Sequence, residues 1–297
     1  MPAKWFICPD ENKTLITDCL NTCRIADQLP AGRCLSLRTL RLIADQREWT
    51  GVPSTTQLLK GTREAYLELV TDYALNPQDE LWRVHGSKAH QLLEQYHDNA
   101  LGEIRLTDEI CSGQFDFYDP GDQVLYDSKT WGSYKIMKAM GFQQVEVDTG
   151  EVYKTGPKKG QPKTRKEWVE GGVPDLFNEE IQLNDYRMKL EAAGFPVKAM
   201  FIEALCRDGN TWMAAKRGIQ QVGVLIPIRR MNDGEVKNYL RVKAMYLNVA
   251  LNPLCNTGSV VLTKCDSRES WDGRKCEKYC RVREACGYGN DEKSATA

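Results

Sequence analysis

Eight of the eleven cysteines fall into two clusters, one at each end of the chain. Successive members of the N-terminal cluster are separated by ten, three and ten residues, and those of the C-terminal cluster by ten, three and five. The eight positions are Cys8, Cys19, Cys23, Cys34, Cys265, Cys276, Cys280 and Cys286. Both segments are short, polar and rich in turn formers, so neither can bury much core by itself. The repeated spacing therefore predicts two modules stabilised by bound metal.

Four thiolates satisfy the tetrahedral coordination of zinc, and they also hold iron–sulfur clusters, so the ligand type does not choose between them. Because the ten-then-three spacing occurs at both ends, we favour two structural Zn²⁺ sites, each formed by its own four cysteines. The remaining cysteines, Cys111, Cys206 and Cys255, stand apart from the clusters and are interpreted as core residues.

The overall composition is that of an ordinary globular chain. With 41% hydrophobic and 27% charged residues over 297 positions, the chain can bury a core and is not expected to be disordered. No run reaches the roughly 18 apolar residues of a membrane-spanning helix, and no hydrophobic signal region opens the sequence. We therefore expect a cytoplasmic protein with no membrane partner. Forty basic and 41 acidic residues give a net charge of −1, so any attraction to nucleic acid must be local.

Between the clusters, the hydrophobic pattern changes period several times. Spacing of three and four residues predicts helices at about 35–47, 55–75, 81–96, 176–193 and 236–252. Short alternating or apolar runs predict strands at 102–110, 113–118, 123–128, 197–206, 211–215 and 222–227. Residues 154–166 hold six basic side chains among Gly and Pro and predict an exposed, mobile loop. This order favours an α/β fold with a central mixed β-sheet flanked by helices.

The predicted strands carry the first candidate chemistry. Asp116 ends a Gly-x-x-Asp motif, and Asp127-Ser128-Lys129 begins eleven residues further on. Because side chains alternate along a strand, Asp127 and Lys129 point to the same face. Two carboxylates hold a hard divalent cation, while a neighbouring lysine orients or deprotonates a water and stabilises charge on a phosphate. This combination suits the hydrolysis of a phosphodiester bond.

Two predicted helices add further polar groups. His90 lies on the helix at 81–96, where its imidazole is a candidate metal ligand. Gln182 and Tyr186 lie four residues apart and so share a helix face, where an amide and a phenol can grip a nucleic-acid strand. The basic loop adds candidate contacts to a phosphate backbone, namely Lys158, Lys159, Lys163, Arg165 and Lys166.

Taken in order, these motifs resemble the RecB-type branch of the PD-(D/E)XK nuclease superfamily, which includes the CRISPR-associated adaptation exonucleases and the AddB nuclease domain. The resemblance covers roughly residues 53–230 and implies a restriction-endonuclease-like core. It implies that Mg²⁺ or Mn²⁺ is bound by His90, Asp116, Asp127 and the carbonyl of Ser128. It also implies that Lys129 is the catalytic lysine, acting with the two carboxylates, and that Gln182 and Tyr186 place the DNA strand.

The resemblance also bears on the cysteines. Several relatives hold a 4Fe–4S cluster with one cysteine before the core and three after it, but Gly61 falls here where the early cysteine would be. Cys34 is a candidate replacement, so the cluster stays the alternative to two zinc sites. We expect an N-terminal four-cysteine module with a helix at 1–52, a nuclease core at 53–254 and a C-terminal four-cysteine module at 255–297.

These features predict a metal-dependent DNA nuclease, either an exonuclease or an enzyme that processes DNA ends. The resemblance implies a prokaryotic or phage-encoded protein that acts in the cytoplasm, in replication, recombination, repair or CRISPR-type DNA processing, with proteins of those machineries as further partners. One alternative is a non-catalytic nucleic-acid-binding or scaffold protein with structural metal sites. A redox or sensing iron–sulfur protein is the other.

Overall fold

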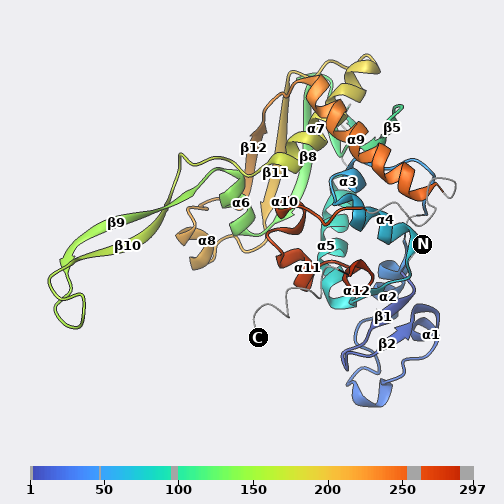
Figure 1. The fold of residues 1–297 in the computed structure, drawn as a ribbon, viewed down its shortest axis with the longest axis horizontal. Coiled ribbons are helices and arrows are strands. Elements are labelled where there is room, and N and C mark those ends of the chain that lie inside the picture. The colour runs from blue at the N-terminus through green and yellow to red at the C-terminus, as the bar shows by residue number, and fades with distance from the viewer. Residues whose placement is uncertain (1–2, 47, 95–99, 253–261, 288–297) are drawn as a thin grey trace. The chain divides into compact units, whose positions relative to one another are not determined.

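The computed structural model describes residues 3–46, 48–94, 100–252 and 262–287, with the side chains of 88–94 outside that description (Figure 1). The chain forms two compact units. One contains Met1–Leu93, Arg105–Gln114 and Asn232–Ala297, and we call it the cysteine-bearing unit. The other contains Glu94–Ile104 and Phe115–Met231, and we call it the sheet unit.

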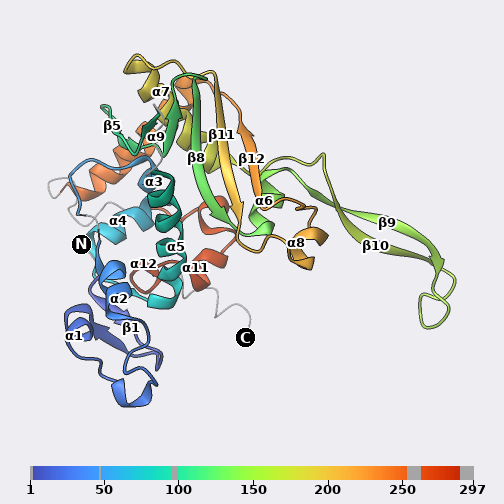
Figure 2. The same cartoon turned by 180° about the vertical axis from the view of Figure 1, so that it is seen from behind.

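A five-stranded sheet forms the core of the sheet unit (Figure 2). Its strands follow the order β12 (Gly223–Ile228), β11 (Ala199–Cys206), β8 (Val124–Trp131), β7 (Phe117–Asp119) and β4 (Leu101–Gly102). β8 and β11 are parallel, whereas the other neighbours are antiparallel. The sequence predictions of a mixed α/β fold and of strands near 123–128, 197–206 and 222–227 are therefore confirmed.

The helices of this unit are α6 (Ser133–Ala139), α7 (Phe177–Ala192) and α8 (Trp212–Lys216). α7 contacts β8 and β12, and it matches the helix predicted at 176–193. The prediction of a strand at 211–215 is wrong. There the side chain of Thr211 accepts a hydrogen bond from the amide of Ala214, which caps a short helix instead.

The prediction of an exposed loop at 154–166 agrees with residues 154–161 but is wrong for 162–166, which belong to a strand. β9 (Gln143–Val152) and β10 (Pro162–Val169) pair antiparallel into a long two-stranded hairpin, which we call the arm (Figure 1). Its strands carry many charged residues, and cross-strand pairs such as Lys166 with Glu146 stabilise them. A free ribbon has no buried face, so its sequence lacks the alternating hydrophobic pattern that identifies a half-buried strand.

Most of the helices lie in the cysteine-bearing unit. They are α1 (Ile16–Asn21), η1 (Ala26–Gln28), α2 (Leu37–Ala44), α3 (Thr55–Leu58), α4 (Thr62–Val70), α5 (Pro77–Glu94), α9 (Asp233–Leu251), α10 (Ser267–Ser270), α11 (Arg274–Lys278) and α12 (Arg283–Cys286). The helix predicted at 55–75 is thus two helices, and Gly61 begins the second as its N-cap residue. No helix among the residues described is long and apolar enough to cross a membrane.

Two small sheets complete this unit. β1 (Trp5–Ile7) pairs antiparallel with β2 (Lys13–Leu15) and parallel with β3 (Ala74–Leu75). β5 (Arg105–Thr107) pairs antiparallel with β6 (Ser112–Gln114). Buried side chains from β1, α2 and α5, including Phe6, Leu40, Ile43 and Val84, form a hydrophobic core that also takes in Cys19.

Candidate active site

Asp127 is the centre of the candidate site. It lies on β8, and its side chain is only 1% exposed. Nζ of Lys129 lies 2.6 Å from Oδ2 of Asp127, because two residues along a strand return to the same face. Burial lowers the pKa of Lys129, but the charges of Asp127 and Asp116 outweigh this and raise that pKa above its usual value. The lysine is therefore held as an ammonium group.

Asp116 lies just before β7 and faces the same group. Its Oδ2 accepts a hydrogen bond of 2.8 Å from the backbone amide of Ser128, which places the carboxyl beside β8. Burial and the negative charge of Asp127 together raise the pKa of Asp116 to about 7, against the opposing effects of Lys129 and the Ser128 amide. Two carboxyl groups in this position repel each other when both are ionised, so the pair favours a proton or a cation.

α7 supports the acidic pair from one side of the sheet. Nε2 of Gln182 lies within hydrogen-bond distance of Oδ1 of Asp127, at 3.3 Å, and of the Tyr186 hydroxyl, at 3.0 Å. Burial and the charge of Asp127 raise the pKa of Tyr186 above its usual value. Both α7 residues are buried. Gln182 therefore contacts Asp127 directly, and Tyr186 contacts Gln182.

The structure brings five of the predicted residues together, namely Asp116, Asp127, Lys129, Gln182 and Tyr186. Ser128 contributes its amide, and its hydroxyl donates to Glu203 at 3.2 Å. The backbone of His90 lies in α5 of the cysteine-bearing unit, while its side chain is outside the described residues.

Sequence reasoning missed Glu179, in the first turn of α7. Its Oε1 lies 3.1 Å from Nζ of Lys135, and its charge adds to those that raise the pKa of Lys129. Its Oε2 is buried with no hydrogen-bond partner within the described part of the chain. Helical spacing offered a signal for this residue, since Glu179 lies three positions before Gln182 and shares its face.

The N-terminal cysteines are close enough to influence one another electrostatically. Burial raises the pKa of Cys19, and the thiols of Cys8, Cys34 and Cys23 raise it further. Burial and the thiol of Cys23 likewise raise the pKa of Cys34. These four predicted ligands therefore form one neighbourhood.

The C-terminal cysteines gather beside α4. Burial, followed by the charges of Glu269 and Glu64, raises the pKa of Cys265 to about 11, and Cys286 adds to this effect. Burial also raises the pKa of Cys280 to about 12. Across the residues that the structure describes, however, no three His, Cys, Asp or Glu side chains converge closely enough to hold a metal ion. The two zinc sites, and the iron–sulfur alternative, stay predictions.

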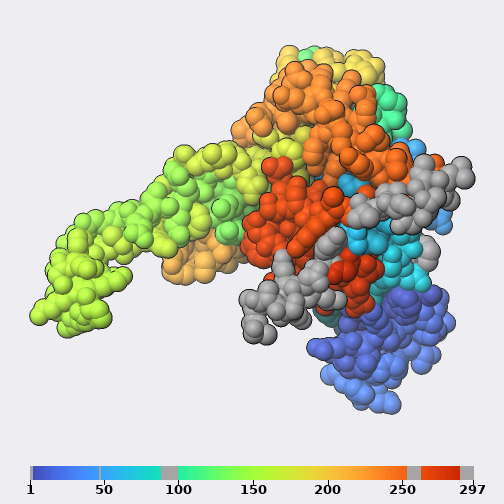
Figure 3. Space-filling model, viewed as in Figure 1, coloured from blue at the N-terminus to red at the C-terminus, as the bar shows by residue number. Residues whose placement is uncertain are grey.

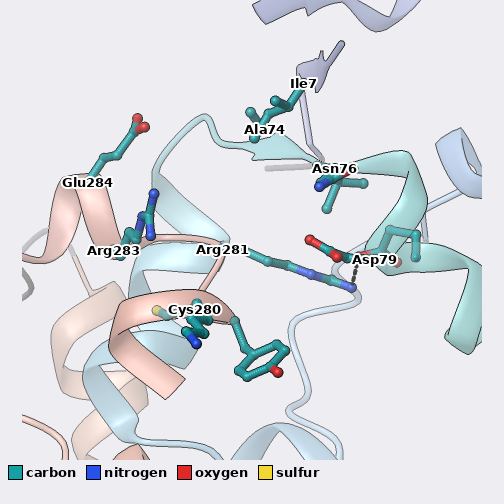
Figure 4. A pocket seen from close by; sticks show the side chains of 12 residues that line it. Ile7, Ala74, Asn76, Asp79, Cys280, Arg281, Arg283 and Glu284 are labelled. Atoms are coloured by element: carbon teal, nitrogen blue, oxygen red, sulfur yellow. Dashed lines mark hydrogen bonds and ion pairs between the residues drawn. The ribbon is translucent and has the colours of Figure 1, made fainter. Parts of the chain in front are cut away.

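A polar cavity of about 380 Å³ lies elsewhere in the cysteine-bearing unit, lined by residues of β3, α5 and the segment before α12 (Figure 4). Arg281 extends into this cavity and pairs with Glu80, which also binds Arg83 at 2.8 Å. The pair between Arg281 and Glu80 joins the C-terminal segment to α5. We assign the cavity a structural role.

No family model matches the chain, and no curated protein matches it. A solved structure described as the crystal structure of SSO0001 aligns with 85% of this chain and 93% of that chain, at 14% sequence identity and a TM-score of 0.42. A likeness of this size carries no weight for fold or function. The interpretation of the site depends on its own geometry.

Proposed function

We propose that the protein is a metal-dependent DNA nuclease of the PD-(D/E)XK type, acting on phosphodiester bonds at or near DNA ends. The observation that carries this proposal is the group formed by Asp116, Asp127 and Lys129. The half-buried carboxyl group of Asp116 interacts electrostatically with the buried one of Asp127, and the ammonium group of Lys129 lies 2.6 Å from Oδ2 of Asp127. The five-stranded mixed sheet with α7 against it is interpreted as the nuclease core.

The residues present fit a hard divalent cation. Repulsion between the two carboxylates contributes to raising the pKa of Asp116 to about 7, and a cation held between them would relieve that repulsion. Asp116 and Asp127 would hold Mg²⁺ or Mn²⁺, with the carbonyl of Ser128 as a further proposed ligand. A bound cation of this kind supplies charge neutralisation at phosphate oxygens and a more acidic water.

The remaining residues orient Asp127 and stabilise negative charge on the phosphate. Lys129, kept protonated by its acidic neighbours, donates to the attacking water or to the negative charge that develops on the phosphate. Gln182 fixes the rotamer of Asp127 through its 3.3 Å contact, and Tyr186 steadies Gln182. The site is therefore preorganised, since its groups reach these positions before substrate binds.

We propose that the eight clustered cysteines form two structural zinc sites, one at each end of the chain, with a 4Fe–4S cluster as the alternative. The thiol neighbourhoods around Cys19 and Cys265 support two separate groups. Metal analysis of the purified protein distinguishes the two: zinc gives a colourless protein, whereas an iron–sulfur centre gives a brown one that absorbs broadly at about 400 nm.

The test of the nuclease is cleavage of end-labelled single- and double-stranded DNA in Mg²⁺ or Mn²⁺. Lys129→Ala should reduce the rate at least about 100-fold, the size expected when a group acting in proton transfer or charge stabilisation is lost. Its affinity for DNA, measured in EDTA, should change much less. The matched control is Lys198→Ala, which removes an exposed lysine from the same unit. If wild type binds DNA but cuts none with either metal, the nuclease proposal is wrong and the scaffold alternative replaces it.

A further inference from the structure

The arm has no role in the site described above. It spans residues 143–169 and contains β9, β10 and the tip between them. It leaves the sheet unit after α6, which follows the end of β8, the strand that carries Asp127 and Lys129. In the space-filling view the arm is a narrow projection from that unit (Figure 3). Every residue from 146 to 167 is exposed or half-buried, so both faces of the ribbon are open to a partner.

Charge is distributed unevenly along the arm. The cations of β10 are balanced by acids: Lys163 lies 2.9 Å from Glu151, and Arg165 lies 2.6 Å from Glu167. Lys166 is directly opposite Glu146.

The tip at 153–161 differs from the strands. It holds three lysines and no acid, and none of the three makes an ion pair within the described residues. These tip lysines are Lys154, Lys158 and Lys159. The positive charge that no acidic side chain balances is therefore concentrated at the far end of the arm, where Nζ of Lys158 also lies 5.9 Å from the centre of the Tyr153 ring.

The length of the arm sets the distance over which it acts. The ten residues of β9 span about 30 Å at roughly 3.3 Å per residue. Along B-DNA, phosphates on one strand are spaced by about 3.4 Å of helix axis, so the tip reaches about nine base pairs from its base. A two-stranded ribbon also has the width that the major groove accepts, about 12 Å.

We propose that the arm binds duplex DNA next to the cleavage site, with the tip lysines contacting phosphates about nine base pairs from the base of the arm. This inference rests on the proposed nuclease function and names its substrate class, a DNA end backed by duplex. A ribbon of fixed length matches a rigid duplex, whose phosphates lie at fixed distances, better than a flexible single strand.

The test measures binding in EDTA to duplexes of about 6, 12 and 20 base pairs and to a single strand of about 20 nucleotides. The tip variant combines Lys154→Ala, Lys158→Ala and Lys159→Ala. The control combines Lys198→Ala, Lys216→Ala and Lys237→Ala, which removes the same charge from exposed sites outside the arm.

Wild type and control should bind the 12- and 20-base-pair duplexes more tightly than the shortest one. The tip variant should bind all three duplexes with similar affinity. The plot of log K against log salt should be less steep for the tip variant than for wild type, by about 2.7 in slope, because three phosphate contacts are lost. Between about 50 and 200 mM salt, the affinity difference between wild type and the tip variant should therefore shrink about 40-fold.

Three results would overturn the proposal. They are a tip variant with the wild-type slope and length dependence, equal weakening of single strand and duplex, or competition by polyglutamate as effective as by duplex, which would indicate an acidic protein partner. Failure of the nuclease proposal can be distinguished from failure of the arm proposal. If wild type cuts DNA but the tip variant binds as wild type does, only the arm proposal fails. If nothing is cut but length-dependent binding is lost in the tip variant, only the nuclease proposal fails.

Discussion

Replacing Asp116 with asparagine should stabilise the metal-free protein at alkaline pH. The pKa of this carboxyl rises from 3.8 to about 7 on folding, because it is buried beside Asp127. Between these two values the folded state holds a proton that the unfolded state has lost. Stability therefore falls as pH rises through that window. At pH 8 the cost of ionising the buried group is about 4 kcal/mol.

Asp116→Asn removes this cost and keeps an oxygen to accept the 2.8 Å hydrogen bond from the Ser128 amide. In EDTA, the free energy of unfolding of the variant should exceed that of wild type by up to about 4 kcal/mol at pH 8 and match it near pH 4. Urea titrations at several pH values measure both differences in the free energy of unfolding. Asp122→Asn, an exposed carboxylate in the following turn, is the control and should change neither.

Mg²⁺ gives the complementary measurement. If the carboxyl pair holds the cation, Mg²⁺ should stabilise wild type more at pH 8 than at pH 6, because binding must displace the proton at the lower pH. Asp116→Asn should lose most of this stabilisation. A variant that is less stable than wild type at pH 8, or that keeps the wild-type pH dependence between pH 4 and 7, would refute the reasoning.

Three other changes test neighbouring parts of the structure. Gln182→Leu removes the amide that joins Asp127 to Tyr186, and it should lower the cleavage rate roughly tenfold and cost about 1–3 kcal/mol in urea unfolding. Arg187→Met removes a fully buried guanidinium that pairs with Glu191 at 2.9 Å; it should cost about 3 kcal/mol, measured in the same way. Cys280→Ser should lower both the bound metal and the melting temperature. Because the pKa of Cys280 is raised to about 12, zinc affinity of wild type, measured by chelator competition, should increase from pH 6 to pH 8.

The geometry around Asp127 followed from two periodicities visible in the sequence. Alternation along a strand put Asp127 and Lys129 on one face, and helical spacing put Gln182 and Tyr186 on another. These local rules held because β8 and α7 are regular through these positions. The contact between Asp116 and the Ser128 amide was beyond such rules, since it depends on how the chain turns before β7.

The arm and α8 show where the same rules fail. The arm is stabilised by cross-strand pairs between residues that no local window contains, such as Lys166 and Glu146. At α8, the apolar run after Thr211 suits a strand or a helix, and the hydrogen bond from Ala214 to the Thr211 side chain decides for the helix. Short apolar runs are ambiguous when periodicity is the only guide.

The structure gives a physical reason for glycine at position 61. It is the N-cap of α4, with φ −56°, a conformation that any residue adopts, so its backbone does not require glycine. The space does. A Cβ built on Gly61 would lie 2.2 Å from Sγ of Cys265. Cys265 therefore fills the volume that a side chain at residue 61 would occupy.

Gly61→Ala should consequently cost about 1–3 kcal/mol in urea unfolding, the usual penalty for overpacking. In a Cys265→Ala background the same change should cost much less, because the nearest remaining contact is the Cβ of residue 265 at 3.1 Å. Additive costs in this double-mutant cycle would show that the two side-chain positions do not share a space. The cycle extends to metal content. If the C-terminal cysteines share one ion, Cys265→Ala alone should lose it, whereas Gly61→Cys combined with Cys265→Ala returns a thiol to almost the same point and should restore it.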